Sequence, residues 1–275
     1  MQKRDLFDCL NRGGMACFAL TEPGAGSDAG SVSCRAEKVE GGYILNGTKC
    51  FITNAPIADK ITLFANTREG GGIRGLTVFL VDADTKGISI GKEEDKMGIR
   101  ASATAEIIFE DCFVPDSARA GKEGRGFMIA MQTLQMSRPV VAAISVGIAQ
   151  AAIEAAVAYS HHRKQFGVKI ATFEMVQQMI ADMVMKTEAA RILTYKACVA
   201  QMNKDKKAGL YSAMSKCFAS DTAMEVTTTA VQVMGGNGYS RENPVEKYMR
   251  DAKIMQIYEG TNQVQRLVIA NETTF

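Results

Sequence analysis

The sequence predicts an α+β protein in which an antiparallel β-barrel or sandwich domain is followed by a C-terminal four-helix bundle. The residue pattern changes near residue 120. Before this point, short β-branched and aromatic runs alternate with turn residues, which is typical of antiparallel strands. After it, apolar residues recur every three or four positions, which is typical of amphipathic helices. The composition, with 47% hydrophobic and 23% charged residues, is that of an ordinary folded protein.

The strand-rich domain is expected to cover residues 15–118. Its predicted strands contain the runs Gly42–Gly47, Lys60–Ala65, Leu76–Val81 and Ala105–Glu110. Turns are predicted at Asn46-Gly47 and at Gly70–Gly72, because glycine adopts positive φ angles without steric cost. Several closely spaced strands with no long helical pattern between them favour a barrel or sandwich.

The helical domain is expected to cover residues 122–275. Long amphipathic segments are predicted at Phe127–Tyr159, Phe173–Met202, Ala208–Met234 and Pro244–Ile269. Short connections between four such segments favour a helical bundle. The joint between the domains is predicted at Asp116–Gly126, and residues 1–14 carry only a weak helical pattern.

The charge and the residue types argue against several kinds of site. The net charge is +2 and the pI about 8.1, so we expect no broad field for nucleic acid or anionic lipid. The seven cysteines form no C-x-x-C pair, and the only two histidines, His161 and His162, are adjacent. We therefore expect reduced cysteines, no metal site and a cytoplasmic protein. No signal-peptide core is visible, and Val140–Tyr159 is expected to be a buried helix rather than a membrane span.

Two glycine-containing segments could bind a ligand. Thr21–Asp28 combines two glycines, which allow close backbone approach, with the hydroxyls of Thr21 and Ser27. Gly235–Gly238 separates two helical patterns and could present backbone N–H groups to a phosphate. Neither matches a standard nucleotide-binding loop, so a polar turn and a helix–helix turn are the alternatives.

A third segment, Ile257–Gln263, contains Glu259 after an apolar run and beside an aromatic residue. A carboxylate in a poorly hydrated pocket has a raised pKa, as a general base that works near neutral pH requires. A solvated carboxylate near a helix end is the alternative. Arg163 and Lys164 close the first long helix, where cations are also expected from the helix dipole alone.

Together these segments resemble the acyl-CoA dehydrogenase family of flavoproteins. Three stretches carry the resemblance: Phe18–Asp28, Gln232–Gly238 and Gln256–Gln263. Three more fall in family order: Phe109–Pro115, Ser137–Pro139 and Arg163–Gly167. The resemblance extends over essentially the whole chain. It implies a β-domain at residues 15–118 and a four-helix bundle at 122–275, with residues 1–14 the remnant of an N-terminal helical domain.

The resemblance implies a non-covalent FAD between these domains, with its adenine end reaching a neighbouring subunit. By position, the residues that would line the flavin are Phe18, Leu20, Thr21, Gly26, Ser27, Phe51 and Thr53. The residues that would hold the pyrophosphate and adenosine end are Arg163, Gln165, Phe166, Gln232 and Gly236. Phe173, Thr261 and Gln263 would complete the site. Phe51 stands where many members have tryptophan.

Glu259 matches the catalytic base of most members of the family. It would remove the α-proton of an acyl-CoA thioester while the β-hydrogen leaves as hydride to the flavin, giving trans-2-enoyl-CoA. The backbone N–H of Glu259 and a flavin hydroxyl would stabilise charge on the thioester oxygen. The substrate would be bordered by Arg138, Tyr258, Gly260 and Ser27. Ser137 stands where some branches carry their base, and a serine does not replace it.

The implied function is that of an FAD-dependent acyl-CoA dehydrogenase for short- to medium-chain substrates. The implied partners are an electron-transfer flavoprotein and further copies of this chain, in a dimer or homotetramer. The missing helical domain closes one side of the acyl pocket in the family, so the alternative is a catalytically inactive flavin- or CoA-binding or assembly subunit. A DNA-associated branch of the family would need a basic surface, for which the small surplus of cations in residues 121–275 gives little support.

Overall fold

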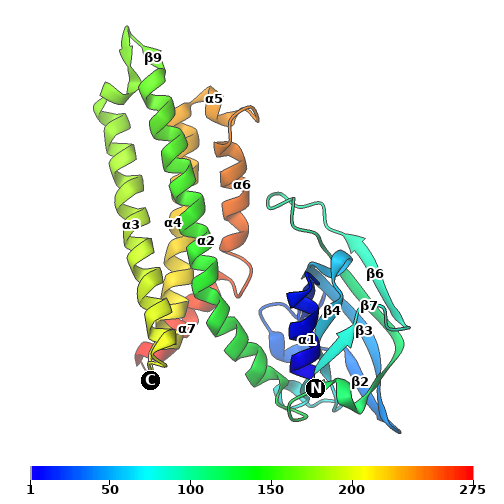
Figure 1. Cartoon of the computed structure of the whole chain (residues 1–275). Helices are drawn as coiled ribbons and strands as arrows, with labels where there is room; N and C mark the ends of the chain where they lie inside the picture. The colour runs from blue at the N-terminus through cyan, green and yellow to red at the C-terminus, as the bar shows by residue number, and fades with distance from the viewer. Residues whose placement is uncertain (1, 275) are drawn as a thin grey trace. The chain divides into compact units, whose positions relative to one another are not determined.

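The computed structural model describes residues 2–274, which divide into two compact units (Figure 1). The β-unit runs through Lys96 and resumes at Arg100–Gln132, and the helical unit comprises Met97–Ile99 and the chain from Thr133 onward. A sheet-containing unit followed by a helical one confirms the predicted α+β class. The division falls inside a long helix rather than at the predicted joint, Asp116–Gly126.

The β-unit consists of helix α1 (Gln2–Asn11) and one eight-stranded sheet. The strands are β1 (Ala16–Ala19), β2 (Arg35–Val39), β3 (Gly42–Thr53), β4 (Lys60–Asn66), β5 (Leu76–Asp82), β6 (Ile88–Glu93), β7 (Thr104–Pro115) and β8 (Arg119–Ala120). They are hydrogen-bonded in the order β6-β7-β3-β2-β4-β5-β8, with β1 on β4. The prediction of an antiparallel sheet is wrong for two pairs, because β1 and β2 both pair with β4 in parallel.

The Asn46-Gly47 pair is not the predicted turn, because it lies inside β3. The register of β3 against β7 shifts between Leu45 and Gly47, which marks a β-bulge. Gly47 has a φ of 144°, and a Cβ there would come within 2.8 Å of the Cα of Cys34. Glycine is therefore required by a close backbone approach. The Gly70–Gly72 turn, between β4 and β5, is confirmed.

A buried ion pair lies beneath the Thr21–Asp28 segment. The Nζ atom of Lys49 is 2.7 Å from a carboxylate oxygen of Glu22, and the two side chains are 0% and 2% exposed. Lys49 also donates to the backbone oxygen of Leu20 at 3.0 Å, and Glu22 accepts from the N–H of Ser33 at 2.6 Å. Burial raises the pKa of Glu22, but Lys49 and Ser33 together lower it below its ordinary value. The pair thereby fixes the start of the segment to β3.

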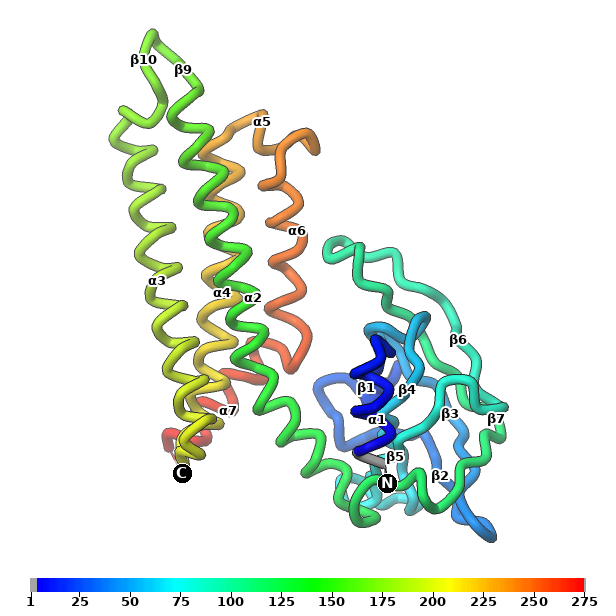
Figure 2. The backbone as a smooth tube through the Cα atoms, viewed as in Figure 1, coloured from blue at the N-terminus to red at the C-terminus, as the bar shows by residue number. Residues whose placement is uncertain are grey.

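The helical unit contains three long helices and several short elements (Figure 2). In chain order these are α2 (Gly126–His162), β9 (Lys164–Gln165), β10 (Val168–Lys169), α3 (Glu174–Met202), α4 (Ala208–Met234), α5 (Gly236–Tyr239), α6 (Val245–Met255) and α7 (Asn262–Thr274). Helix α2 is continuous through Pro139. The predicted fourth segment, Pro244–Ile269, is instead two helices, because Glu259 and Gly260 between them have φ angles of 59° and 87°, outside the right-handed helical range.

Small side chains form the core between α2, α3, α4 and α6. Helix α4 packs against α3, α6 and α7. The buried cluster consists of Ala149, Ala152, Ile153, Ala156, Met183, Ala223, Val226, Ala230, Val233, Met234, Val245 and Ala252. Because half of these residues are alanine, the helices approach one another closely.

Helix α2 is long and apolar enough to cross a membrane by length and composition alone. Core helices of soluble proteins pass the same test, and 44% of its most apolar window is buried. All seven cysteines are free thiols, as predicted, and five of them are buried.

The Lys49–Glu22 pair predicts a large loss of stability when one partner is removed. Lys49→Met should lower the free energy of unfolding by about 3–5 kcal/mol, because it leaves a buried carboxylate without its cation. Adding Glu22→Gln should recover about half of that loss. Urea unfolding measures both. Lys60→Met, which breaks the more exposed pair with Asp82, is the control and should cost less than about 1 kcal/mol. A Lys49→Met variant no less stable than this control would contradict the assigned role.

Candidate active site

The side chains around Glu259 meet within the helical unit. Glu259 lies in the turn between α6 and α7, and its carboxylate accepts a hydrogen bond from the hydroxyl of Ser137 on α2. Arg138 on α2 and Lys216 on α4 are 8% and 0% exposed. Burial raises the pKa of Glu259, and the hydrogen bond from Ser137 and the positive charges of Arg138 and Lys216 oppose this effect without cancelling it. The pKa of Glu259 therefore lies above its ordinary value of 4.5.

The backbone of this turn is held by two buried side chains. Gln265 on α7 donates through Nε2 to the carbonyl oxygens of Glu259 and Gly260, at 3.3 and 3.0 Å. Lys216 donates to the carbonyl oxygen of Gly260 at 2.8 Å. The hydroxyl of Thr261 accepts the backbone N–H three residues later at 3.2 Å and so caps α7. The turn is thus tied to both α4 and α7.

Two donors in the Glu259 site, the Nε of Arg138 and the backbone N–H of Glu259, lack hydrogen-bond partners among residues 2–274. The Nε atom of Arg138 is buried without a hydrogen bond, and burial lowers the pKa of this guanidinium. No partner within the described chain is found for the backbone N–H of Glu259. Tyr258 donates to the sulfur of Met255 at 2.9 Å, and burial raises its pKa to about 12, so it is neutral. A ligand oxygen would satisfy the unused donors.

A second group of predicted residues lies in the β-unit. The N–H of Cys50 donates to the backbone oxygen of Thr21 at 3.0 Å, which joins the Thr21–Asp28 segment to the end of β3. Phe51 has a φ of 56° and is 65% exposed. A Cβ on Gly26 would meet nothing within 4 Å. An exposed aromatic ring and unobstructed glycine backbone in segments joined by this hydrogen bond fit a planar ring system such as a flavin. Ser27 and Thr53 are also exposed.

Two of the predicted flavin residues, Phe18 and Leu20, pack into the core of the β-unit. The ring of Phe18 lies 4.7 Å from that of Phe64, measured between centroids. Leu20 is only 7% exposed. Both residues therefore support the segment on which Thr21 lies.

A third group lies at one end of the helical unit, where Figure 1 shows β9 and α5. Arg163 and Gln165 are exposed at the β9–β10 hairpin. Phe166, 95% exposed with a φ of 49°, makes an edge contact with Phe173 at 6.2 Å between centroids. Gln232 and Gly236 lie at the α4–α5 junction, and α5 is bound to α2 through a hydrogen bond of 2.5 Å from Asn237 to Tyr159. A cation, an aromatic ring and bare glycine backbone fit a phosphorylated nucleoside.

Backbone strain coincides with the predicted site residues. The non-glycine residues of the described chain with positive φ are Phe51, Asn54, Ile99, Asp111, Phe166, Lys204 and Glu259. Three of these seven are predicted site residues, one in each of the three groups. Such conformations cost about 1–3 kcal/mol each and concentrate at functional sites.

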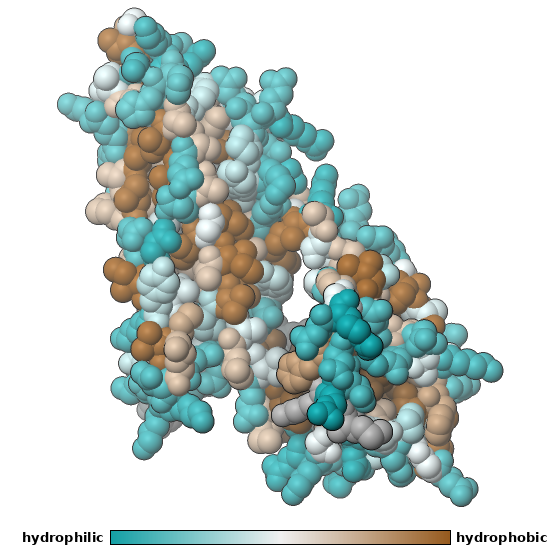
Figure 3. All heavy atoms as spheres, viewed as in Figure 1, coloured by the Kyte–Doolittle hydropathy of each residue, from teal (hydrophilic) through white to brown (hydrophobic). Residues whose placement is uncertain are grey.

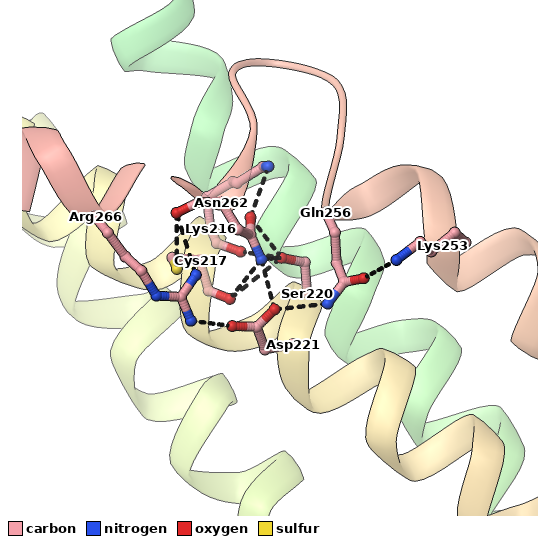
Figure 4. Close-up of polar contacts among 8 residues, drawn as sticks. All are labelled: Lys216, Cys217, Ser220, Asp221, Lys253, Gln256, Asn262 and Arg266. Atoms are coloured by element: carbon pink, nitrogen blue, oxygen red, sulfur yellow. Dashed lines mark hydrogen bonds and ion pairs between the residues drawn. The ribbon is translucent and has the colours of Figure 1, made fainter. Parts of the chain in front are cut away.

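A polar pocket of about 360 Å³ lies next to the Glu259 turn. Its lining residues are Asp221, Lys253, Gln256, Ile257, Thr261, Asn262, Gln263 and Arg266. Figure 4 shows polar contacts among several of these residues, including that of Asp221 with Arg266 at 2.6 Å. The predicted residues Thr261 and Gln263 thus border a cavity, and Glu259 is not among its lining residues.

Sequence reasoning missed Lys216, Asn262 and Gln265, which are 0%, 2% and 0% exposed. A signal for Lys216 exists in the sequence. It occupies a core position of the apolar repeat of α4, which continues at Ala219, Ala223 and Val226. A lysine at such a position is buried and needs a partner. No comparable signal marks Asn262 or Gln265, because polar residues at a helix start are usually explained as caps.

Comparison with known proteins identifies the family. Residues 17–112 match the family model for the acyl-CoA dehydrogenase middle domain, and residues 124–273 match that for the C-terminal domain. The chain belongs to the acyl-CoA dehydrogenase family. The predicted family is thereby confirmed, and with it the enzyme class: acyl-CoA dehydrogenases are FAD-dependent oxidoreductases.

Individual acyl-CoA dehydrogenases resemble nearly the whole chain. A probable acyl-CoA dehydrogenase of Mycobacterium tuberculosis is 50% identical over 98% of this chain and 69% of its own length. The structure of butyryl-CoA dehydrogenase from Megasphaera elsdenii has 47% identity and a TM-score of 0.94, over 96% of this chain and 69% of that one. A chain from the electron transferring flavoprotein structure of Acidaminococcus fermentans has 51% identity and a TM-score of 0.92, over 94% and 68%. This chain therefore spans slightly more than two thirds of each relative.

The raised pKa of Glu259 predicts a pH-dependent stability difference. The folded protein binds this proton more tightly than the unfolded chain, so Glu259 makes the free energy of unfolding fall as pH rises from 4.5 through the folded-state pKa. Glu259→Gln removes this contribution. The free energy of unfolding of the variant, minus that of the wild type, should therefore increase as pH rises through this window and then level off. Urea unfolding between about pH 4 and pH 8 measures it, with the exposed Glu272→Gln as control. A difference that is constant with pH would contradict the raised pKa.

Proposed function

We propose that this chain catalyses the α,β-dehydrogenation of a short- to medium-chain acyl-CoA to trans-2-enoyl-CoA, with Glu259 as the base. The observation that carries the proposal is the partly buried carboxyl group of Glu259, which has a raised pKa and interacts electrostatically with two buried cations, Arg138 and Lys216. A carboxylate with a raised pKa is a stronger base than a solvated one, as the removal of a weakly acidic proton requires. The similarity to butyryl-CoA dehydrogenase supports a short acyl chain.

In the proposed reaction, the carboxylate of Glu259 takes the α-proton of the thioester, and the electron pair of that C–H bond becomes the new C=C bond. FAD supplies the acceptor for the hydride that leaves the β-carbon. The unpartnered backbone N–H of Glu259 donates to the thioester oxygen, where negative charge develops. Ser137 holds the carboxylate through its hydroxyl hydrogen bond.

Substrate contacts are proposed for the residues that flank Glu259 in space or in sequence. Arg138, with its unused Nε, and the neutral Tyr258 would border the thioester and the CoA chain. Gly260, which has no side chain, would leave room at the turn for the substrate. Ser27 of the β-unit would contact the pantetheine. These assignments rest on the resemblance and on the exposed or unpartnered polar atoms described above.

The FAD contacts are proposed in two sets. In the β-unit, Thr21, Gly26, Ser27, Phe51 and Thr53 would bind the flavin, with Phe18 and Leu20 supporting them from the core. In the helical unit, the set is Arg163, Gln165, Phe166, Phe173, Gln232, Gly236, Thr261 and Gln263. The exposed rings of Phe51 and Phe166, both on residues with positive φ, support this division, because an exposed aromatic face suits stacking on a ligand.

Assembly with further copies of the chain is also proposed. Along α3, the side chains of Met185, Ile192, Tyr195, Val199 and Met202 recur at intervals of three to seven residues and are 55–81% exposed. Hydrophobic atoms reach the surface along the helical unit in Figure 3. An apolar stripe of this regularity is typical of a helix that packs against a partner. A dimer or tetramer would cover it.

We propose that α2, α3, α4 and α6, which share one core, form a four-helix bundle in a domain at residues 122–275. The sheet is proposed to form a barrel or sandwich in a domain at residues 15–118. Electron-transfer flavoprotein is the proposed electron acceptor, supported by the similarity to a chain in such a structure. The free cysteines support a reducing, cytoplasmic location.

Glu259→Gln tests the base assignment. The purified variant should hold FAD as the wild type does, but reduction of the flavin by butyryl-CoA should be slower by about 10³-fold or more, because no group accepts the α-proton. Stopped-flow bleaching of the flavin absorbance under anaerobic conditions measures the rate, and Glu272→Gln is the control. Undiminished bleaching would reject Glu259 as the base. A colourless wild-type protein of normal fold would reject the proposed function itself.

Arg163→Ala tests the proposed adenosine site. Loss of a cation that binds the pyrophosphate across a subunit interface should weaken FAD binding by about 10-fold or more and shift the oligomer toward smaller species. FAD titration and light scattering measure the two effects. Lys169→Ala removes another exposed cation from the same hairpin and should change neither. Normal FAD affinity with unchanged assembly in Arg163→Ala would contradict the assignment.

A further inference from the structure

Lys216 is a fully buried cation without a carboxylate partner. It lies in the middle of α4, is 0% exposed, and no carboxylate of the described chain lies within ion-pair distance of its Nζ atom. Its acceptors are both neutral: the backbone oxygen of Gly260 at 2.8 Å and the side-chain oxygen of Asn262 at 2.9 Å. An ammonium group in this setting is costly to bury, so its position requires a reason beyond packing.

One acceptor of Lys216 is held rigidly by its own contacts. The side-chain amide of Asn262 donates to the hydroxyl of Ser220 at 2.9 Å and to the carboxylate of Asp221 at 2.7 Å, which directs its oxygen toward Lys216 (Figure 4). Asp221 is in turn bound by Gln256 at 2.7 Å, from the beginning of the Glu259 turn. The polar network therefore connects α4 to both ends of the turn.

The other acceptor belongs to the strained part of the turn. Glu259 and Gly260 both have positive φ angles, 59° and 87°. A Cβ at Gly260 would lie only 2.5 Å from the Nε2 atom of Gln265, so the backbone is closely enclosed. A left-handed glutamate persists only where its surroundings hold it. Lys216 and Gln265 are the side chains that hold it, through the carbonyl groups.

The titratable groups that affect Lys216 come from α2, α4 and the turn. They are Arg138 on α2, Cys217 and Asp221 on α4, and Glu259 in the turn. Asp221 is also bound by Arg266 of α7. Burial is the largest effect and lowers the pKa of Lys216 to about 8. Lys216 is therefore mostly protonated at neutral pH and loses its proton as pH rises through about 8. The charge of Lys216 also lowers the pKa of Glu259.

We propose that Lys216 is the positioning residue of the active site: its ammonium group holds the turn that presents Glu259 and keeps that partly buried carboxyl group ionisable. The first part stands on the structure of the turn alone, and the second rests on the proposed function of Glu259. Deprotonation of Lys216 removes the positive charge that strengthens its two hydrogen bonds, so the turn loosens and the Glu259 carboxylate becomes harder to form.

Lys216→Met tests the proposal with a side chain of similar length and no charge. Relative to wild type, flavin reduction by butyryl-CoA should slow by about 10-fold or more, because a displaced base loses alignment. The acid limb of the rate against pH should move to higher pH, because the pKa of Glu259 is no longer lowered by the cation. A role in packing alone would not move that limb. Lys196→Met, which removes an exposed cation above the Tyr211 ring, is the control.

An unchanged acid limb with a reduction rate within about twofold of wild type would overturn the proposal. A second measurement needs no variant. Hydrogen exchange of the peptide covering residues 256–265 in the wild type, normalised to intrinsic rates, should show protection that falls with a midpoint near pH 8, where Lys216 deprotonates. Flat protection across that range would overturn the proposal even if Lys216→Met does not fold. A wild type that butyryl-CoA does not bleach would reject the proposed function, and the exchange measurement would still decide the role of Lys216.

Discussion

The partial burial of one carboxyl group at a left-handed turn, within the electrostatic influence of two buried cations, is the constraint on which the rest of the helical site depends. Removal from water raises the pKa of Glu259, and Arg138, Lys216 and the hydroxyl of Ser137 oppose that rise. Desolvation favours the neutral acid and the cations favour the carboxylate, and desolvation is the larger of the two effects. The position of the turn between α6 and α7 combines both.

Both units use a fully buried lysine to fix a backbone carbonyl at a segment that carries predicted ligand residues. Lys49 donates to the oxygen of Leu20 and Lys216 to that of Gly260. The difference is the counterion. Glu22 neutralises Lys49 directly, whereas Lys216 has only neutral acceptors and its pKa falls to about 8. The first lysine is therefore suited to permanent support, and the second responds to pH.

The sequence predicted the two-part α+β organisation because strand and helix periodicities differ and the change between them is abrupt. It predicted Glu259 and the glycine segments as site residues through the resemblance, because the order of motifs along the chain can be compared without knowing the geometry of the site. It could not predict the bulge at Gly47, because an Asn-Gly pair suits a hairpin turn equally well and only the proximity of Cys34 decides. It also could not divide Pro244–Ile269 into two helices. The apolar pattern continues across the turn, and the interruption depends on hydrogen bonds from Lys216 and Gln265. Lys216 is distant from the turn in the sequence, and Gln265 looks like an ordinary helix residue.

The protonation of Glu259 can be measured without substrate turnover. In difference infrared spectra of wild type against Glu259→Gln, the carboxyl C=O stretch that only the wild type shows reports protonated Glu259, and its intensity can be followed with pH. A midpoint above 4.5 is the expected result, because burial outweighs the nearby cations. A midpoint at or below 4.5 would mean that the carboxyl group is solvated or fully neutralised by its neighbours, and the assignment of Glu259 as a buried base would then be wrong.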